Sequence, residues 1–167
     1  MIRRLALALC LLAPALARAE EAPAPAVGAR LAVQVESARG HTGAGFRNGL
    51  AGLRVDLVFS PRVSLGAYAG AANLKGKDGR TQSALGYVQL EYLAPLAPHF
   101  LNLRVPLRFA TGYLARNGPV VRGSLGFAAA LSQRIDLIAE IFTPMAWVTH
   151  DQTLFSTNVA LELAMRF

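Results

Sequence analysis

Cysteine and lysine are almost absent from this 167-residue chain. The single cysteine, Cys10, lies in an N-terminal apolar segment, so the rest of the chain has no disulfide or thiol chemistry. Lysine occurs only as Lys75 and Lys77, and the chain is 53% hydrophobic with 16% charged residues. That composition excludes a disordered chain and an ordinary soluble helical protein.

Long apolar runs are also missing after residue 19, which excludes a membrane-spanning helix in that part of the chain. The N-terminal run Leu5–Leu12 is too short to span a membrane. Basic residues precede it, and the small-x-small pattern Ala17-Arg18-Ala19 follows it. We therefore expect a cleaved signal peptide over residues 1–19, a Pro/Ala-rich tether over residues 20–27 and one domain over residues 28–167.

The chain has no excess of negative charge; its formal net charge is +7. Three arginines lie in the expected signal peptide, and the remainder has 14 basic against 10 acidic residues, a net charge of +4. This excess is small and is not clustered. We therefore expect no nucleic-acid partner.

Alternation of apolar and polar residues runs through the rest of the chain. The last segment shows it most clearly, with large apolar residues at every second position from Phe155 to Phe167. Eight such segments, each about 9–11 residues long, indicate strands. Residues typical of turns separate them at 38–47, 60–62, 73–80, 94–99, 115–119, 132–134 and 149–153. Segment 136–148 is the least regular, because Glu140 shares its parity with Ile138 and Phe142, and Pro144 is a candidate bulge position.

The composition of the polar face indicates which side of the sheet faces inward. It is mostly small and uncharged, and its charges balance, as a narrow lumen filled by Arg–carboxylate pairs requires. We call these ten residues the lumen charge network: Glu36, Arg54, Asp56, Glu91, Arg104, Arg108, Arg122, Glu140, Glu162 and Arg166. Aromatic residues near strand ends predict interfacial girdles: Phe59, Tyr92, Phe100, Tyr113, Trp147 and Phe155. We therefore predict an all-β fold, an eight-stranded antiparallel up-and-down transmembrane β-barrel. The alternative is a soluble lipocalin-like barrel with its apolar face inside.

The N-terminal segment and the last strand, Val159–Phe167, resemble those of the small eight-stranded bacterial outer-membrane barrels of the OmpA/OmpX type. The resemblance implies an outer-membrane location, a periplasmic tether, and membrane lipids and lipopolysaccharide as partners. It also implies a C-terminal signal read by the barrel-assembly machinery. The residues of that insertion signal would be Val159, Leu161, Leu163, Met165 and Phe167.

Some relatives of this type modify lipid A, so we considered the rim residues His41, Ser37, His150, Asp151 and Ser156 as an acyl-transfer site. Their spacing does not match that chemistry. We expect no enzyme activity, no cofactor and no metal site. We expect a monomer with a structural, envelope or surface-interaction role. A narrow channel for ions or small solutes remains an alternative, as does a lipid A-modifying enzyme. The basic loop formed by Lys75, Lys77 and Arg80 is a candidate contact for lipopolysaccharide phosphates.

Overall fold

A computed structural model describes residues 28–41, 47–75, 82–97, 102–148 and 153–167. The expected signal peptide and tether, as well as Phe100, lie outside these residues. Among the described residues, no helix is long and apolar enough to cross a membrane.

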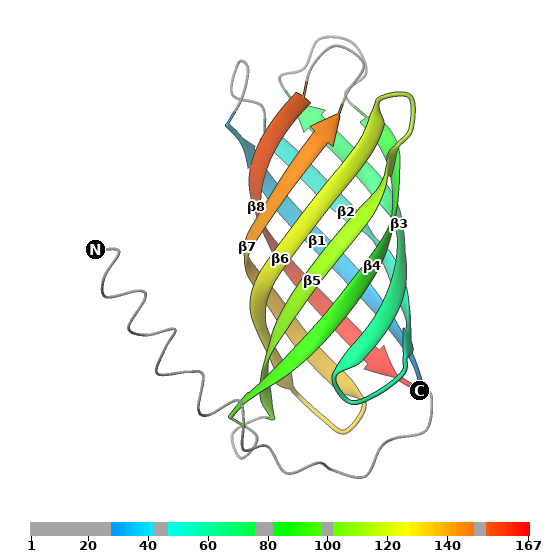
Figure 1. The fold of residues 1–167 in the computed structure, drawn as a ribbon, viewed down its shortest axis with the longest axis vertical. Coiled ribbons are helices and arrows are strands. Elements are labelled where there is room, and N and C mark those ends of the chain that lie inside the picture. The colour runs from blue at the N-terminus through cyan, green and yellow to red at the C-terminus, as the bar shows by residue number, and fades with distance from the viewer. Residues whose placement is uncertain (1–27, 42–46, 76–81, 98–101, 149–152) are drawn as a thin grey trace, which may run out of the picture.

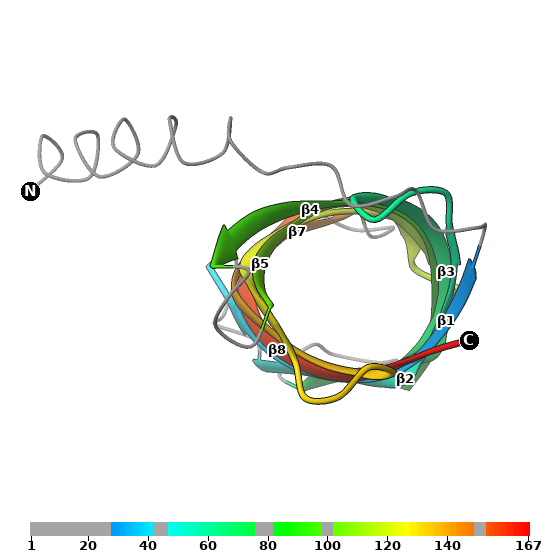
Figure 2. The ribbon, with the colours of Figure 1, turned by 90° about the horizontal axis from the view of Figure 1, so that it is seen from below.

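Eight antiparallel strands of 12 to 16 residues form one closed barrel (Figures 1 and 2). Each strand pairs with its neighbour in the sequence, and β1 closes the ring against β8. The predicted eight-stranded antiparallel up-and-down barrel is therefore confirmed. The strands are β1 (Gly28–Gly40), β2 (Arg47–Val58), β3 (Val63–Lys75), β4 (Gln82–Ala97), β5 (Leu103–Leu114), β6 (Gly118–Ala130), β7 (Ile135–Val148) and β8 (Thr153–Arg166).

The connections between strands lie at two ends of the barrel, which we call the loop end and the turn end. At the loop end, β1 joins β2, β3 joins β4, β5 joins β6 and β7 joins β8; at the turn end lie the other three connections and the C-terminus (Figure 1). The strands are longer than the 9–11 residues expected. The turn expected at 94–99 begins too early, because β4 continues to Ala97 through an irregularity between Pro95 and Ala97.

A bulge in β7 explains its irregular pattern. The register against β8 shifts between Glu140 and Thr143, so that Ile141 and Phe142 both face outward. Before the bulge Ile138 and Glu140 point inward, and after it Thr143 does. The bulge thus lies just before Pro144, and it reverses the parity of the second half of the strand.

The outer wall of the barrel is apolar. Large hydrophobic side chains alternate with inward-facing residues along the strands, and many of them are about half exposed. On β8, the exposed large hydrophobic residues are Phe155, Val159, Leu161, Leu163 and Met165, followed by Phe167.

Candidate functional site

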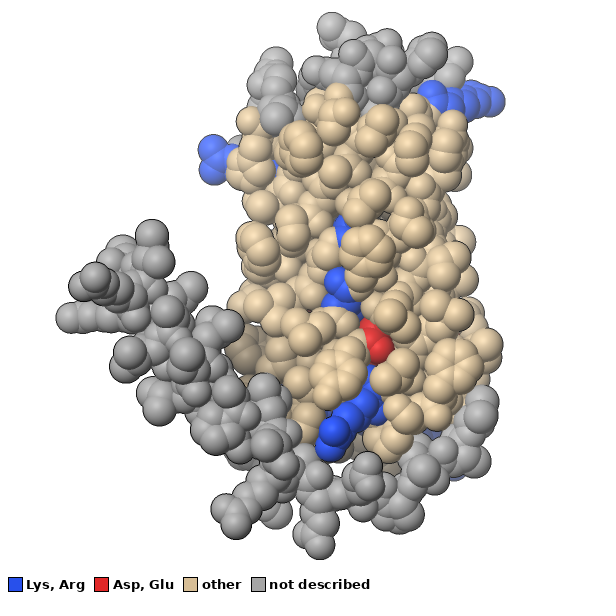
Figure 3. All heavy atoms as spheres, viewed as in Figure 1, with Lys and Arg blue, Asp and Glu red and all other residues tan. Residues whose placement is uncertain are grey.

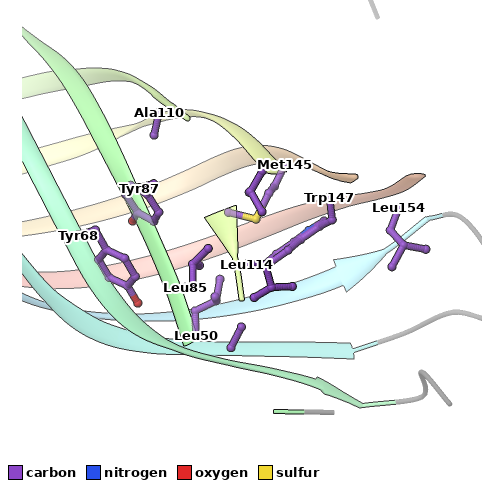
Figure 4. Packing of buried hydrophobic residues seen from close by; sticks show 11 residues of the cluster. Leu50, Tyr68, Leu85, Tyr87, Ala110, Leu114, Met145, Trp147 and Leu154 are labelled. Atoms are coloured by element: carbon purple, nitrogen blue, oxygen red, sulfur yellow. The ribbon is translucent and has the colours of Figure 1, made fainter. Parts of the chain in front are cut away.

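The loop-end half of the lumen is filled by an apolar plug (Figure 4). Its residues come from all strands except β1: Leu50, Tyr68, Ala72, Leu85, Tyr87, Ala110, Leu114, Val120, Met145, Trp147 and Leu154. All are buried, and most of them lie within a few residues of the loop-end terminus of their strand. The plug therefore occupies the lumen below the loops.

Two stacked tyrosines form the inner edge of this plug. The rings of Tyr68 and Tyr87 lie 4.4 Å apart between centroids and nearly parallel, at 8°. Glycines on the neighbouring strands make room for them. A Cβ added to Gly52 would lie 2.5 Å from the Tyr68 ring, and one added to Gly112 would lie 2.4 Å from the Tyr87 Cβ. These glycines are therefore required by close approach of side chains inside the barrel.

Trp147 belongs to the plug, so its predicted place among the interfacial aromatics is wrong. Its side chain is fully buried, and its indole Nε1 donates a hydrogen bond to Ser156 Oγ at 3.0 Å. The physical reason is the bulge at Ile141–Phe142, which reverses the parity of β7. By contrast, Phe59, Tyr92, Tyr113 and Phe155 face outward.

The turn-end half of the lumen is filled by charge, and Arg108 is its centre. The Arg108 guanidinium lies 2.6 Å from Glu91 and 2.9 Å from Glu162, and it also donates to Glu140. All four side chains are buried. One arginine from β5 thus contacts carboxylates from β4, β7 and β8.

A second arginine, Arg54, ties β2 to β8. Its two terminal nitrogens donate to the two oxygens of Glu162 at 2.7 and 2.6 Å, a bidentate pair. Its Nε donates to Asp56 at 3.0 Å. The network therefore links strands that are far apart in the sequence across the barrel interior.

Arg122 connects the network to the apolar plug. It lies 3.0 Å from Glu36 and also pairs with Glu140, and its guanidinium carbon lies 5.7 Å from the centre of the Tyr87 ring. Glu36 also accepts hydrogen bonds from Asn158 and, at 2.9 Å, from Gln34. Polar side chains therefore satisfy the carboxylate where the two halves of the lumen meet.

Two buried charges belong to this arrangement that sequence reasoning missed. Arg30 Nε donates to Asp56 at 2.7 Å, and the same guanidinium pairs with Glu91. Asp136 lies nearer the turn end, where it accepts from Arg104 at 2.7 Å and from Arg166 Nε at 2.7 Å. Both residues lie near strand ends, and their inward parity was the available signal.

The structure brings the ten predicted network residues into the lumen together with Arg30 and Asp136. Six arginines thus face six carboxylates, and every acidic residue among those the structure describes lies inside the barrel. Each carboxylate has at least one arginine partner, which offsets part of the desolvation cost. In this confined space the arginines and carboxylates neutralise one another's charge.

The residues considered for acyl transfer do not form a nucleophile–base pair within the described part of the chain. His41 Nε2 lies 2.6 Å from Thr157 Oγ1, and the hydroxyl of Ser156 accepts the bond from Trp147. Ser37 is exposed. His150 and Asp151 lie outside the described residues. Likewise, the His, Asp and Glu residues that the structure describes form no group able to hold a metal ion.

Comparison with solved structures identifies the same architecture elsewhere. The chain is similar to neisserial surface protein A, with a TM-score of 0.58 and 10% identity over 83% of this chain and 97% of that one. It is also similar to the N-terminal β-barrel domain of OprF from Pseudomonas aeruginosa (TM-score 0.51, 9% identity, 81% and 97% coverage). A de novo designed transmembrane β-barrel matches with a TM-score of 0.52 and 15% identity, over 83% of this chain and 95% of the design.

These likenesses confirm the predicted resemblance to small eight-stranded outer-membrane barrels at the level of the fold. No protein-family model matches the chain, and no curated protein matches it.

Proposed function

We propose that this chain is an integral barrel of the bacterial outer membrane with a structural or surface-interaction role and no catalytic activity. The observation that carries the proposal is the separation of side chains between the two faces of the sheet. Large apolar residues cover the outside, and the described carboxylates lie inside. A hydrocarbon environment favours this arrangement, because an outward charge near the bilayer centre costs about 2–4 kcal/mol.

Charges at the ends of the barrel support the same placement. Arg39 and Arg116 are exposed at the loop end, and Arg134 is exposed at the turn end. Basic side chains project from the loop end in Figure 3. Cations that flank an apolar belt suit the phosphate groups of membrane lipids and lipopolysaccharide. Lys77 and Arg80 of the predicted basic loop lie outside the described residues.

The lumen supports a closed barrel over its two alternatives. The apolar plug lies across the loop-end half of the lumen, which argues against a continuous water-filled path for ions. The charged interior is the reverse of the apolar cavity that a soluble lipocalin-like barrel presents to its ligand.

The test is electrophoretic mobility before and after boiling, combined with conductance in planar bilayers. We expect the chain refolded in detergent to change mobility on boiling and to leave bilayer conductance at baseline. A chain that folds and stays soluble without detergent would overturn the membrane placement. A steady single-channel current would contradict the closed barrel and support the channel alternative.

The non-enzymatic role has a separate test. We expect the acyl composition of lipid A, measured by mass spectrometry, to be unchanged when the chain is expressed in a bacterial outer membrane. A change that disappears in a His150→Ala variant would instead support the lipid A-modifying alternative.

A further inference from the structure

A shallow groove lies on the outer wall where β4, β5, β6 and β7 run side by side. It has a volume of about 490 Å³, within the range of small-ligand pockets. Tyr92, Phe109, Leu125 and Phe142 are among the residues that form its walls, and Gly123 and Ser124 form part of its floor.

The groove exists because one large outward side chain is missing. Val121 and Leu125 on β6 are outward-facing and exposed, but Gly123 between them has no side chain. Gly123 pairs with Phe109 on β5, and a Cβ added to Gly123 would lie 3.8 Å from Pro144 Cγ on β7. Bulky side chains on both neighbouring strands therefore flank an empty position.

Backbone pairing in the wall is also incomplete at this point. Within the described strands, the β6–β7 register passes from Arg122–Met145 directly to Leu125–Phe142, and Pro144 has no backbone N–H to donate. Arg108 of the lumen charge network contributes to the lining of the groove. Figure 3 shows charged atoms between the other side chains in the middle of this face.

We propose that this groove binds the hydrocarbon chain of a membrane lipid, one lipid per barrel. Gly123 and Phe109 lie near the middle of their strands, so the groove opens at the depth of acyl chains and away from the headgroups. Its walls are continuous with the apolar belt. An acyl chain in the groove covers the gap in the β6–β7 pairing and keeps water from the backbone and the charge network. This inference rests on the proposed membrane location.

The experiment is native mass spectrometry of the full chain in detergent, titrated with dipalmitoyl phosphatidylethanolamine. We expect one lipid to remain bound under activation that removes the others. Gly123→Leu fills the groove and should lower the retained fraction about tenfold, the effect of removing about two buried methylene groups from contact. Gly86→Leu is the matched control, because Gly86 is also outward-facing and lies outside the groove, with its nearest contact at 3.6 Å.

Equal lipid retention by Gly123→Leu and Gly86→Leu would overturn the inference, as would a wild-type chain that keeps no lipid. Analytical ultracentrifugation tests a second occupant. If the wild-type chain is a dimer that retains no lipid, and Gly123→Leu dissociates this dimer, the groove binds a second copy of the chain and the inference is overturned. If Gly123→Leu shows no mobility shift on boiling, the variant has not folded, and Phe142→Ala replaces it. That substitution removes one wall of the groove, and we expect the same loss of lipid retention. A chain that shifts mobility on boiling but retains no lipid refutes only this inference. A chain that folds and stays soluble without detergent refutes the proposed function.

Discussion

In the loop-end half of the lumen, the Trp147 indole donates one hydrogen bond and belongs to a cluster of apolar side chains. In the turn-end half, Arg108 alone contacts three carboxylates. Both side chains are large and buried. The first is held by packing against its neighbours, and the second by neutralisation of its charge. The two halves should therefore respond differently to substitutions that preserve shape and to substitutions that preserve charge.

The largest effect should follow removal of the central cation. Arg108→Ala leaves Glu91, Glu140 and Glu162 short of a partner in a buried site. We expect the free energy of unfolding to fall by about 3–5 kcal/mol, measured by urea titration in lipid vesicles. The control Arg134→Ala removes an exposed arginine and should change it by less than about 0.5 kcal/mol. Equal losses in the two variants would mean that the network contributes nothing specific.

A change of charge without a change of shape should be the next most costly. Glu162→Gln keeps the side-chain volume but turns one acceptor of the bidentate Arg54 pair into an N–H donor. We expect a loss of about 2–3 kcal/mol in the same titration. If Glu162→Gln lowers the free energy of unfolding no more than Trp147→Phe in the plug does, the two halves of the lumen do not differ in how they are stabilised.

In the plug, added volume should matter where the backbone is close. Gly112→Ala places a Cβ 2.0 Å from the Gly86 carbonyl oxygen and 2.4 Å from Tyr87 Cβ. We expect a loss of about 1–3 kcal/mol. Gly49→Ala is the control, because nothing lies within 4 Å of its added Cβ, and it should be neutral or slightly stabilising. Similar stability of both variants would show that the Tyr87 side of the plug can adjust.

The smallest effect should come from a change in the plug that keeps an aromatic side chain. Trp147→Phe keeps an aromatic ring at this position, but it removes the hydrogen bond to Ser156 and leaves a small cavity, because phenylalanine is smaller than tryptophan. We expect a loss of about 1–2 kcal/mol, read from gel mobility across a urea series. A loss as large as that of Arg108→Ala would mean that the plug depends on this polar contact rather than on packing.

Sequence reasoning predicted the barrel because alternation survives in most strands. It is nearly continuous in β8, where a half-exposed residue alternates with a buried one from Leu154 to Met165. It predicted the charge network for the same reason, since an inward charge in a narrow barrel needs an opposite charge. The pairing itself was not predictable, because Arg54 meets Glu162 only after the ring closes.

The two kinds of error have local causes. Trp147 was placed on the wrong face because the alternation reverses at a bulge, and the sequence marks that bulge only by Pro144 nearby. Arg30 and Asp136 have the inward parity of their strands, and they were missed because they lie near strand ends, where the sequence does not show how far each strand extends. Counting parity forward from Thr143 and Met145 would have placed Trp147 inside.

The distribution of lumen charge among the strands bears on how the barrel assembles. On β5 and β6 the lumen charges are arginines only, Arg104, Arg108 and Arg122, whereas on β4 and β7 they are carboxylates only, Glu91, Asp136 and Glu140. A β5–β6 hairpin entering the membrane alone would carry three uncompensated cations. Neutrality is thus a property of the assembled ring and of no single hairpin in this region, so insertion and closure are expected to occur as one coupled event.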